Sequence, residues 1–218
     1  MASQTEGVVI DPSAQRAPLT ATAAEIKQLL TVIEKDILPR TEAGVAAGNK
    51  VFGAAVLDSD LNVIHADTNC ETECPLFHGE VKVIYEWSQK VPAAQRGPAA
   101  VNSIFLATHE PCCMCISSIV WSGFNKCYYF FPYAVTAAQG IPYDINTMHE
   151  LWGVNSYRKV NKYCATAGLM ELIEELPESE EKTELLAQQQ RLLDAYDKLA
   201  AKYHSEKANN ANNSLVLG

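Results

Sequence analysis

The sequence predicts an α/β fold in which a mixed β-sheet is covered by helices. Short apolar runs of strand length alternate with segments of helical periodicity, and glycine, proline and asparagine residues separate them. The chain has 218 residues, of which 48% are hydrophobic. A chain of this size can bury the core of one domain without disulfide staples. We expect that domain at residues 20–176.

The first predicted helix begins after Thr22. Thr22 and Glu25 have the spacing of a capping box, in which each residue binds a free backbone N–H of the other. Apolar residues then recur at helical spacing: Ile26, Leu29, Leu30, Ile33 and Ile37. We expect Pro39 to end or kink this helix, because proline lacks an N–H and crowds the preceding turn. The polar residues 1–19 are expected to form a flexible leader.

Strands and helices alternate through the middle of the chain. Strands are expected at residues 51–57, 63–66, 103–107, 126–131 and 157–164. The first two strands are expected to form a hairpin. Helical patterns cover residues 79–89 and 112–121, and residues 140–153 are expected to be irregular or helical.

The C-terminal part of the chain has a different pattern. Leu185, Leu192 and Leu199 are spaced by seven, which predicts an amphipathic helix within residues 177–207. This helix is expected to dock on the core or on a second subunit, and a regulatory or partner-binding role is the alternative. Residues 208–218 contain four asparagines and are expected to form a disordered tail.

Composition excludes several classes of protein. There are 26 acidic and 17 basic residues, a net charge of −9, so general binding to nucleic-acid backbones is not expected. No apolar run approaches the about 18 residues of a membrane span. The N-terminus lacks the pattern of a secretory signal. We therefore expect a cytoplasmic protein whose seven cysteines are reduced thiols.

Two short motifs contain the residues that predict chemistry, FHGE at residues 77–80 and EPCCMC at residues 110–115. One nitrogen from His78 and two sulfurs from Cys112 and Cys115 form a donor set that suits zinc. Cysteines three residues apart on a first helical turn point the same way. Three protein ligands leave a fourth position open, as a catalytic zinc requires. Glu80 is close enough in sequence to act as a proton carrier there.

Two other interpretations of these motifs stay open. Cys113 could complete a closed, purely structural zinc site, or the thiols could be buried in a core without metal. Cys113 is expected to point away from its two neighbours, which favours the open site. Cys70 and Cys74 lack a second pair, so we interpret them as loop thiols. His109 is expected either to hydrogen-bond locally or to line the pocket.

The order H-x-E followed by P-C-x-x-C resembles the cytidine deaminase superfamily of zinc-dependent nucleobase and nucleoside deaminases. The resemblance covers about residues 22–165 and is closest in motif to the branch of guanine, cytosine and transfer-RNA adenosine deaminases. It implies a three-layer fold, with a five-stranded mixed sheet and helices on both faces. It also implies hydrolytic removal of an exocyclic amine, with zinc on His78, Cys112 and Cys115 and with Glu80 as the proton shuttle.

The same resemblance implies a set of contacts to the substrate. Asn69 would grip the heterocycle, although a turn asparagine is the alternative. A backbone amide at Gly79 or Cys113 would hold a ring carbonyl. Asp144 would contact the base, and Phe52 is an aromatic residue that can stack on it.

Several functions remain open at this stage. A guanine-like purine is slightly favoured as substrate over cytosine or cytidine, because residues 137–151 resemble a stretch of guanine deaminases. The glycine of the HGE motif, by contrast, resembles fungal-type cytosine deaminases. A deaminase-fold assembly subunit without activity and a polynucleotide-editing enzyme are the remaining alternatives. The resemblance also implies that the protein forms a homodimer. It further implies that its ligand is a small aminated heterocycle.

Overall fold

The computed structural model describes residues 15–210. Most of the expected leader (1–19) and tail (208–218) lies outside the described residues, so both stay predictions. Within residues 15–210, no helix is long and apolar enough to cross a membrane.

Five strands form one mixed sheet, in agreement with the sequence. They are β1 (Gly53–Leu57), β2 (Val63–Thr68), β3 (Ile104–His109), β4 (Lys126–Phe131) and β5 (Ala165–Gly168), in the order β2-β1-β3-β4-β5. β1 is antiparallel to both of its neighbours, whereas β3, β4 and β5 are parallel. The β1–β2 hairpin turns at Asp58, whose carboxylate accepts the N–H groups of Asp60 and Asn62 at 2.9 Å.

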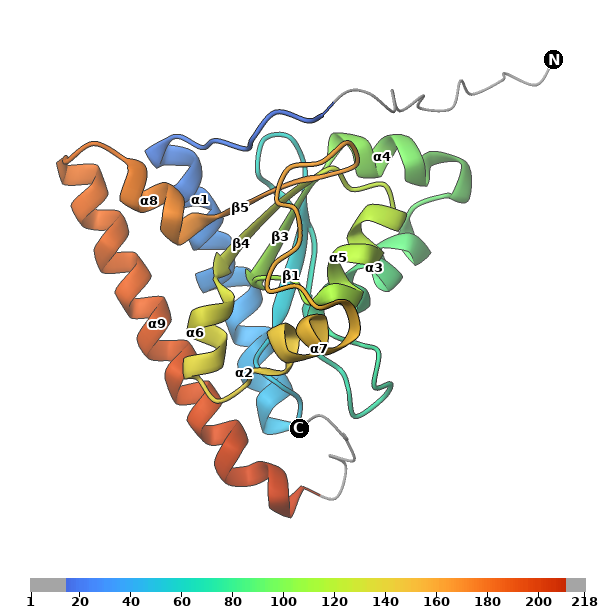
Figure 1. Ribbon diagram of the computed structural model, residues 1–218, viewed down its shortest axis with the longest axis vertical. Helices are drawn as coiled ribbons and strands as arrows, with labels where there is room; N and C mark the ends of the chain where they lie inside the picture. Colours follow the sequence, from blue (N-terminus) through green and yellow to red (C-terminus); the bar gives the residue numbers. More distant parts are fainter. Residues whose placement is uncertain (1–14, 211–218) are drawn as a thin grey trace.

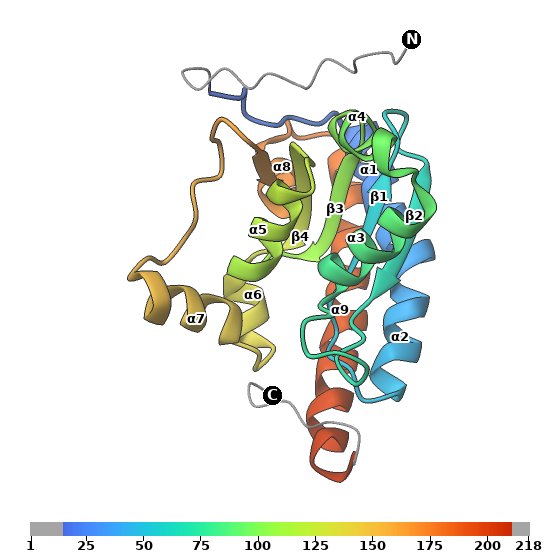
Figure 2. The same cartoon turned by 90° about the vertical axis from the view of Figure 1, so that its right-hand side faces the viewer.

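Helices cover both faces of the sheet (Figures 1 and 2). Helices α3 (Gly79–Lys90), α4 (Arg96–Asn102) and α5 (Cys113–Trp121) lie on one face. Helices α1 (Ala23–Val32), α2 (Leu38–Ala46), α8 (Leu169–Glu175) and α9 (Glu180–Glu206) lie on the other. Alternate strand residues face opposite layers, so that Ala54 and Val56 pack under α3 while Ala55 and Leu57 face the larger core. The expected three-layer α/β architecture is confirmed.

The first helical segment begins where the sequence predicts. The Thr22 N–H donates to Glu25 Oε2 at 2.7 Å, and the Glu25 N–H donates to Thr22 Oγ1 at 3.2 Å. Of the two expected effects of Pro39, the end of the helix is wrong, because the chain stays helical from α1 into α2. A single π-helical turn, η1 (Ile33–Ile37), precedes the proline, and the Leu38 N–H binds the Ile33 carbonyl. This wider turn accommodates a residue that cannot donate a backbone hydrogen bond.

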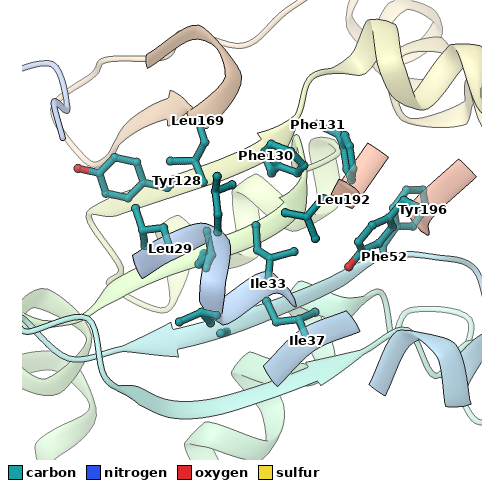
Figure 3. Packing of buried hydrophobic residues seen from close by; sticks show 14 of the residues in the cluster. Leu29, Ile33, Ile37, Phe52, Tyr128, Phe130, Phe131, Leu169, Leu192 and Tyr196 are labelled. Atoms are coloured by element: carbon teal, nitrogen blue, oxygen red, sulfur yellow. The ribbon is translucent and has the colours of Figure 1, made fainter. Parts of the chain in front are cut away.

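Helix α9 docks on the core of its own chain, the first of the expected alternatives. Leu185, Leu192 and Leu199 are buried, and the helix packs against α1, α2 and α8. Tyr196 and Tyr203 fill the interleaved positions of the same stripe. Figure 3 shows Leu192 and Tyr196 beside core residues of the sheet and of the first helical segment. The Ser179 hydroxyl caps the helix by accepting the Lys182 N–H at 3.1 Å.

The fifth strand lies further along the chain than predicted. Residues 157–164 are irregular, and the strand is the short run Ala165–Gly168. Tyr157 and Lys159 have strand-like neighbours in sequence, but their side chains pack together over Tyr129 instead. The Asn161 side-chain oxygen then accepts the N–H groups of residues 163 and 164, which forms a turn directly before the strand.

Two further helices follow β4 and form the end of the molecule that contains the candidate site. Helix α6 (Tyr133–Ala138) leads into α7 (Tyr143–Trp152), which packs against α5 and α6. Residues 140–153 were expected to be irregular or helical, and most of this segment forms the helix α7. Gly153, with φ of 68°, ends α7 in the left-handed region that glycine tolerates. Short 3₁₀ turns at residues 93–95 and 207–209 complete the described chain.

Candidate metal-dependent active site

The three predicted metal ligands meet at the N-terminal ends of two neighbouring helices. His78 is the N-cap residue of α3 and Cys112 is the N-cap residue of α5, while Cys115 lies in the first turn of α5. Because α3 and α5 pack side by side on one face of the sheet, their starts come together. The partial positive charge at both helix ends favours thiolates there.

The donor atoms have the separation that zinc requires. His78 Nδ1 lies 3.7 Å from Cys112 Sγ and 3.6 Å from Cys115 Sγ. All three donor atoms lie within 4.8 Å of one another. Tetrahedral zinc, with Zn–S of about 2.3 Å and Zn–N of about 2.0–2.1 Å, places nitrogen and sulfur about 3.5–3.6 Å apart. The residues present therefore fit a zinc ion without rearrangement.

The electrostatics of the cysteine pair also suit a metal. A hydrogen bond from the Cys115 thiol lowers the pKa of Cys112 well below its usual range, and the neighbouring His78 lowers it further. Burial raises the pKa of Cys115. The pair thus offers one thiolate readily and a second thiol whose proton a divalent cation would displace.

Glu80 is the second residue of α3 and is buried next to these ligands. Burial, together with the charge of the Cys112 thiolate, raises the pKa of Glu80 to about 7. The charge of the neighbouring His78 partly offsets this rise in the pKa of Glu80. A carboxyl group whose pKa lies near neutrality can both accept and return a proton.

A cavity of about 250 Å³ opens beside the metal ligands. His78 and Cys112 form part of its wall, so an ion held by them would face the cavity. Phe52 and Cys113 line it as well, and Asp144 reaches it from the first turn of α7. Burial raises the pKa of Asp144 well above its usual range. The cavity therefore combines aromatic and apolar walls with a buried carboxyl group.

Two of the predicted substrate contacts lie behind the cavity wall rather than on it. The Gly79 N–H donates a short hydrogen bond to Asn69 Oδ1. Asn69 Nδ2 is buried and has no hydrogen-bond partner among residues 15–210, which leaves a buried donor unsatisfied. Gly79 itself lies against β1, where an added Cβ would stand 2.7 Å from Gly53 Cα. The close approach of the two backbones therefore requires a glycine at position 79.

The remaining candidate residues have clear positions. Cys113 is not among the clustered metal donors of the described chain, and its Sγ lies 4.0 Å from Thr147 Oγ1. This placement favours the open zinc site over the closed one. His109 is buried, with its ring nitrogens bonded to Thr108 and Gln139, and it does not line the cavity. Of the two interpretations of His109, local hydrogen bonding therefore agrees with the structure.

Sequence reasoning missed several residues that line the cavity. Lys50, Tyr143 and Thr147 all face it, but none belongs to either motif. Lys50 precedes the first strand, and the other two come from a helix whose existence the sequence left open. Their proximity depends on tertiary packing, so no spacing along the chain signalled it.

Comparison with known proteins shows which family region and which folds the chain resembles. Residues 27–131 match the model of the cytidine and deoxycytidylate deaminase zinc-binding region. No curated protein matches the sequence significantly. The solved structure of a guanine deaminase from Nitrosomonas europaea has 19% identity and a TM-score of 0.50, over 89% of this chain and 90% of that chain.

A second solved structure gives the same picture of the fold. It is a point variant crystallised in complex with 8-azaguanine, with 18% identity and a TM-score of 0.51, over 89% of this chain and 90% of that chain. At such low identity these structures establish the fold alone. The match of the zinc-binding region covers both motifs, and the donor geometry agrees with it. Residues 27–131 therefore contain a zinc-binding region of the cytidine and deoxycytidylate deaminase type.

Proposed function

We propose that this protein is a zinc-dependent aminohydrolase that removes an exocyclic amine from a small nucleobase-type heterocycle, with a guanine-like purine as the first candidate. One observation carries the proposal: the metal ligands His78 and Cys112 form a wall of a cavity large enough for a heterocycle. The buried Glu80 lies against the same ligands.

Each residue has a defined task in this reaction. Zinc supplies Lewis-acid activation of a water molecule at neutral pH. The Glu80 carboxylate takes a proton from the attacking water and delivers it to the departing amine. The carbon loses its C–N bond and gains a C–O bond, and the second proton of the water ends on the adjacent ring nitrogen. The products are therefore a ring carbonyl beside a ring N–H, and ammonia. Burial of Glu80 keeps bulk water away from this proton transfer.

The size and the lining of the cavity favour a single base as the substrate over a polynucleotide. Its volume of about 250 Å³ corresponds to roughly eight water molecules at about 30 Å³ each. Phe52 offers a ring face, and Asp144 offers a carboxyl group to ring N–H donors. Asn69 lies behind the cavity wall, where its side-chain oxygen accepts the Gly79 N–H at the start of α3. Guanine has ring N–H donors and a carbonyl acceptor, and relatives in fold include a guanine deaminase.

The test is ammonia release from a panel of guanine, cytosine, adenine and their nucleosides. We expect the zinc-loaded wild-type protein to release ammonia from at least one base, guanine first. His78→Ala should bind zinc weakly and release none. Release from cytosine alone would replace the purine by a pyrimidine substrate. Silence of the zinc-loaded wild type on the whole panel would contradict the proposal.

The same proposal includes a homodimer, which superfamily resemblance implies. Light scattering of the purified protein should give twice the mass of one chain. A monomeric mass would remove the dimer from the proposal and leave the reaction untouched, because the ligands and Glu80 come from one chain.

A further inference from the structure

We propose that Glu71 is a positioning residue for the metal ligand His78, and that Lys50 balances the charge of Glu71. The inference rests on the proposed function, because it concerns how the zinc site is held. It adds residues that lie outside both sequence motifs.

The two ring nitrogens of His78 face different groups. Nδ1 faces the two cysteine sulfurs at 3.6–3.7 Å. Nε2, on the opposite side of the ring, lies 3.7 Å from Glu71 Oε1, a distance of ion-pair contact rather than of a hydrogen bond. The carboxylate therefore stands behind the ligand, on the side away from the metal.

This arrangement selects one tautomer of the imidazole. A neutral histidine that binds metal through Nδ1 must carry its proton on Nε2. A carboxylate beside Nε2 stabilises that proton, fixes the plane of the ring and makes the ligating nitrogen more basic. Glu71 is the group placed to do this for His78.

Glu71 is itself held firmly by Lys50. The Lys50 backbone N–H donates to Glu71 Oε2 at 3.0 Å, and Lys50 Nζ lies 3.2 Å from Glu71 Oε1. The side chains of Glu71 and Lys50 are only 1% and 6% exposed. A carboxylate so deeply buried requires a partner of opposite charge. The same Lys50 lines the substrate cavity, so one residue connects the cavity wall to the support of the metal ligand.

The chain provides a matched control two residues away. Glu73 is on the same loop, but its side chain is 61% exposed and pairs with Lys82 at 3.3 Å. Its substitution changes the net charge of the loop by the same amount as substitution of Glu71. Any effect specific to Glu71 must therefore come from its buried contacts with His78 and Lys50.

The experiment measures zinc affinity by competition with a chelator for wild type, Glu71→Gln and Glu73→Gln. We expect Glu71→Gln to bind zinc about 10–100-fold more weakly, the usual effect of losing such an outer partner. Glu73→Gln should bind zinc like the wild type. On the substrate found by the panel, Glu71→Gln should lower kcat and leave KM near that of wild type, because Glu71 does not line the cavity.

A second variant separates positioning from folding. Glu71→Gln removes the buried carboxylate that pairs with Lys50, and this loss by itself lowers the stability of the protein. Lys50→Gln combined with Glu71→Gln removes both charges, and we expect the same loss of zinc affinity. If either variant, folded by circular dichroism, holds zinc as tightly as wild type, the inference is overturned and the proposed function stands. If His78→Ala holds zinc as tightly as wild type, the proposed zinc site itself fails.

Discussion

Replacement of Gly79 by alanine tests how closely the start of α3 is fitted to the sheet. An added Cβ would stand 2.7 Å from Gly53 Cα and 3.0 Å from both Gly53 N and the Phe52 carbonyl oxygen. All three neighbours are backbone atoms at the start of the interior strand β1. They cannot swing aside as a flexible side chain can, so the helix start must move.

The size of the effect follows from that geometry. Bringing the closest contact from 2.7 Å to ordinary van der Waals separation, which begins at 3.4 Å, moves the start of α3 by about 0.7 Å. Overpacking of this kind costs about 1–3 kcal/mol of unfolding free energy. His78 and Glu80 flank Gly79 and must move with it. A displacement near 1 Å at a reacting centre can cost about 100-fold in rate.

The assay combines urea unfolding with zinc affinity and ammonia release for Gly79→Ala. Gly97→Ala is the matched control, because a Cβ at that helical position meets nothing within 4 Å. The control should be neutral or stabilised by up to about 1 kcal/mol. If Gly79→Ala matches wild type in unfolding free energy, zinc affinity and rate, the close backbone approach does not shape the site and the reasoning is refuted.

Three further predictions follow from other parts of the fold. Burial lowers the pKa of His109 from 6.5 to about 3, so below pH 6.5 the unfolded chain takes up a proton that the folded chain refuses. The unfolding free energy should therefore fall by about 3 kcal/mol between pH 7 and pH 4.5 from this group, and His109→Gln should flatten that slope in urea titrations. Leu192→Ala should lower the unfolding free energy measured in urea by about 2–5 kcal/mol, because the Leu192 side chain is 1% exposed. A loss below about 1 kcal/mol would mean that α9 is not part of the core. Asp144→Asn should raise KM about 10-fold through the loss of a hydrogen bond to a ring N–H of the substrate without changing zinc affinity, and an unchanged KM would remove Asp144 from the substrate contacts.

The spacing of apolar residues was sufficient to predict most of the helices and strands, because each of them buries a continuous apolar face. The continuous apolar run of β1 is buried on both faces of the sheet, and the seven-residue spacing in α9 corresponds to one buried stripe. The fifth strand was misplaced because residues 157–164 contain tyrosines and valine that favour strands, whereas ATAG at 165–168 has little strand propensity of its own. Pairing with β4 determines the strand there, and no local pattern reports it.

The candidate site was also predictable only in part, because some of its residues meet only in the folded chain. Spacing within two motifs was enough to predict the donors of the metal cluster, because each motif sits on one helix start. Lys50 and Glu71 are 21 positions apart in sequence and neighbours in space, so only the fold reveals their relation to His78. Asn69 and Gly79 are not among the residues that line the cavity, so their expected contacts with a substrate stay predictions. Such positions depend on how loops close over the sheet.

The central claim is that Glu80 moves the proton at a zinc site built from this one chain. Its most direct test is ammonia release by wild type and Glu80→Ala, at equal zinc content, on the best substrate from the panel. We predict equal zinc binding and a loss of about 100-fold or more in kcat for Glu80→Ala. Equal rates from the two proteins would contradict the assignment of Glu80 as the proton carrier.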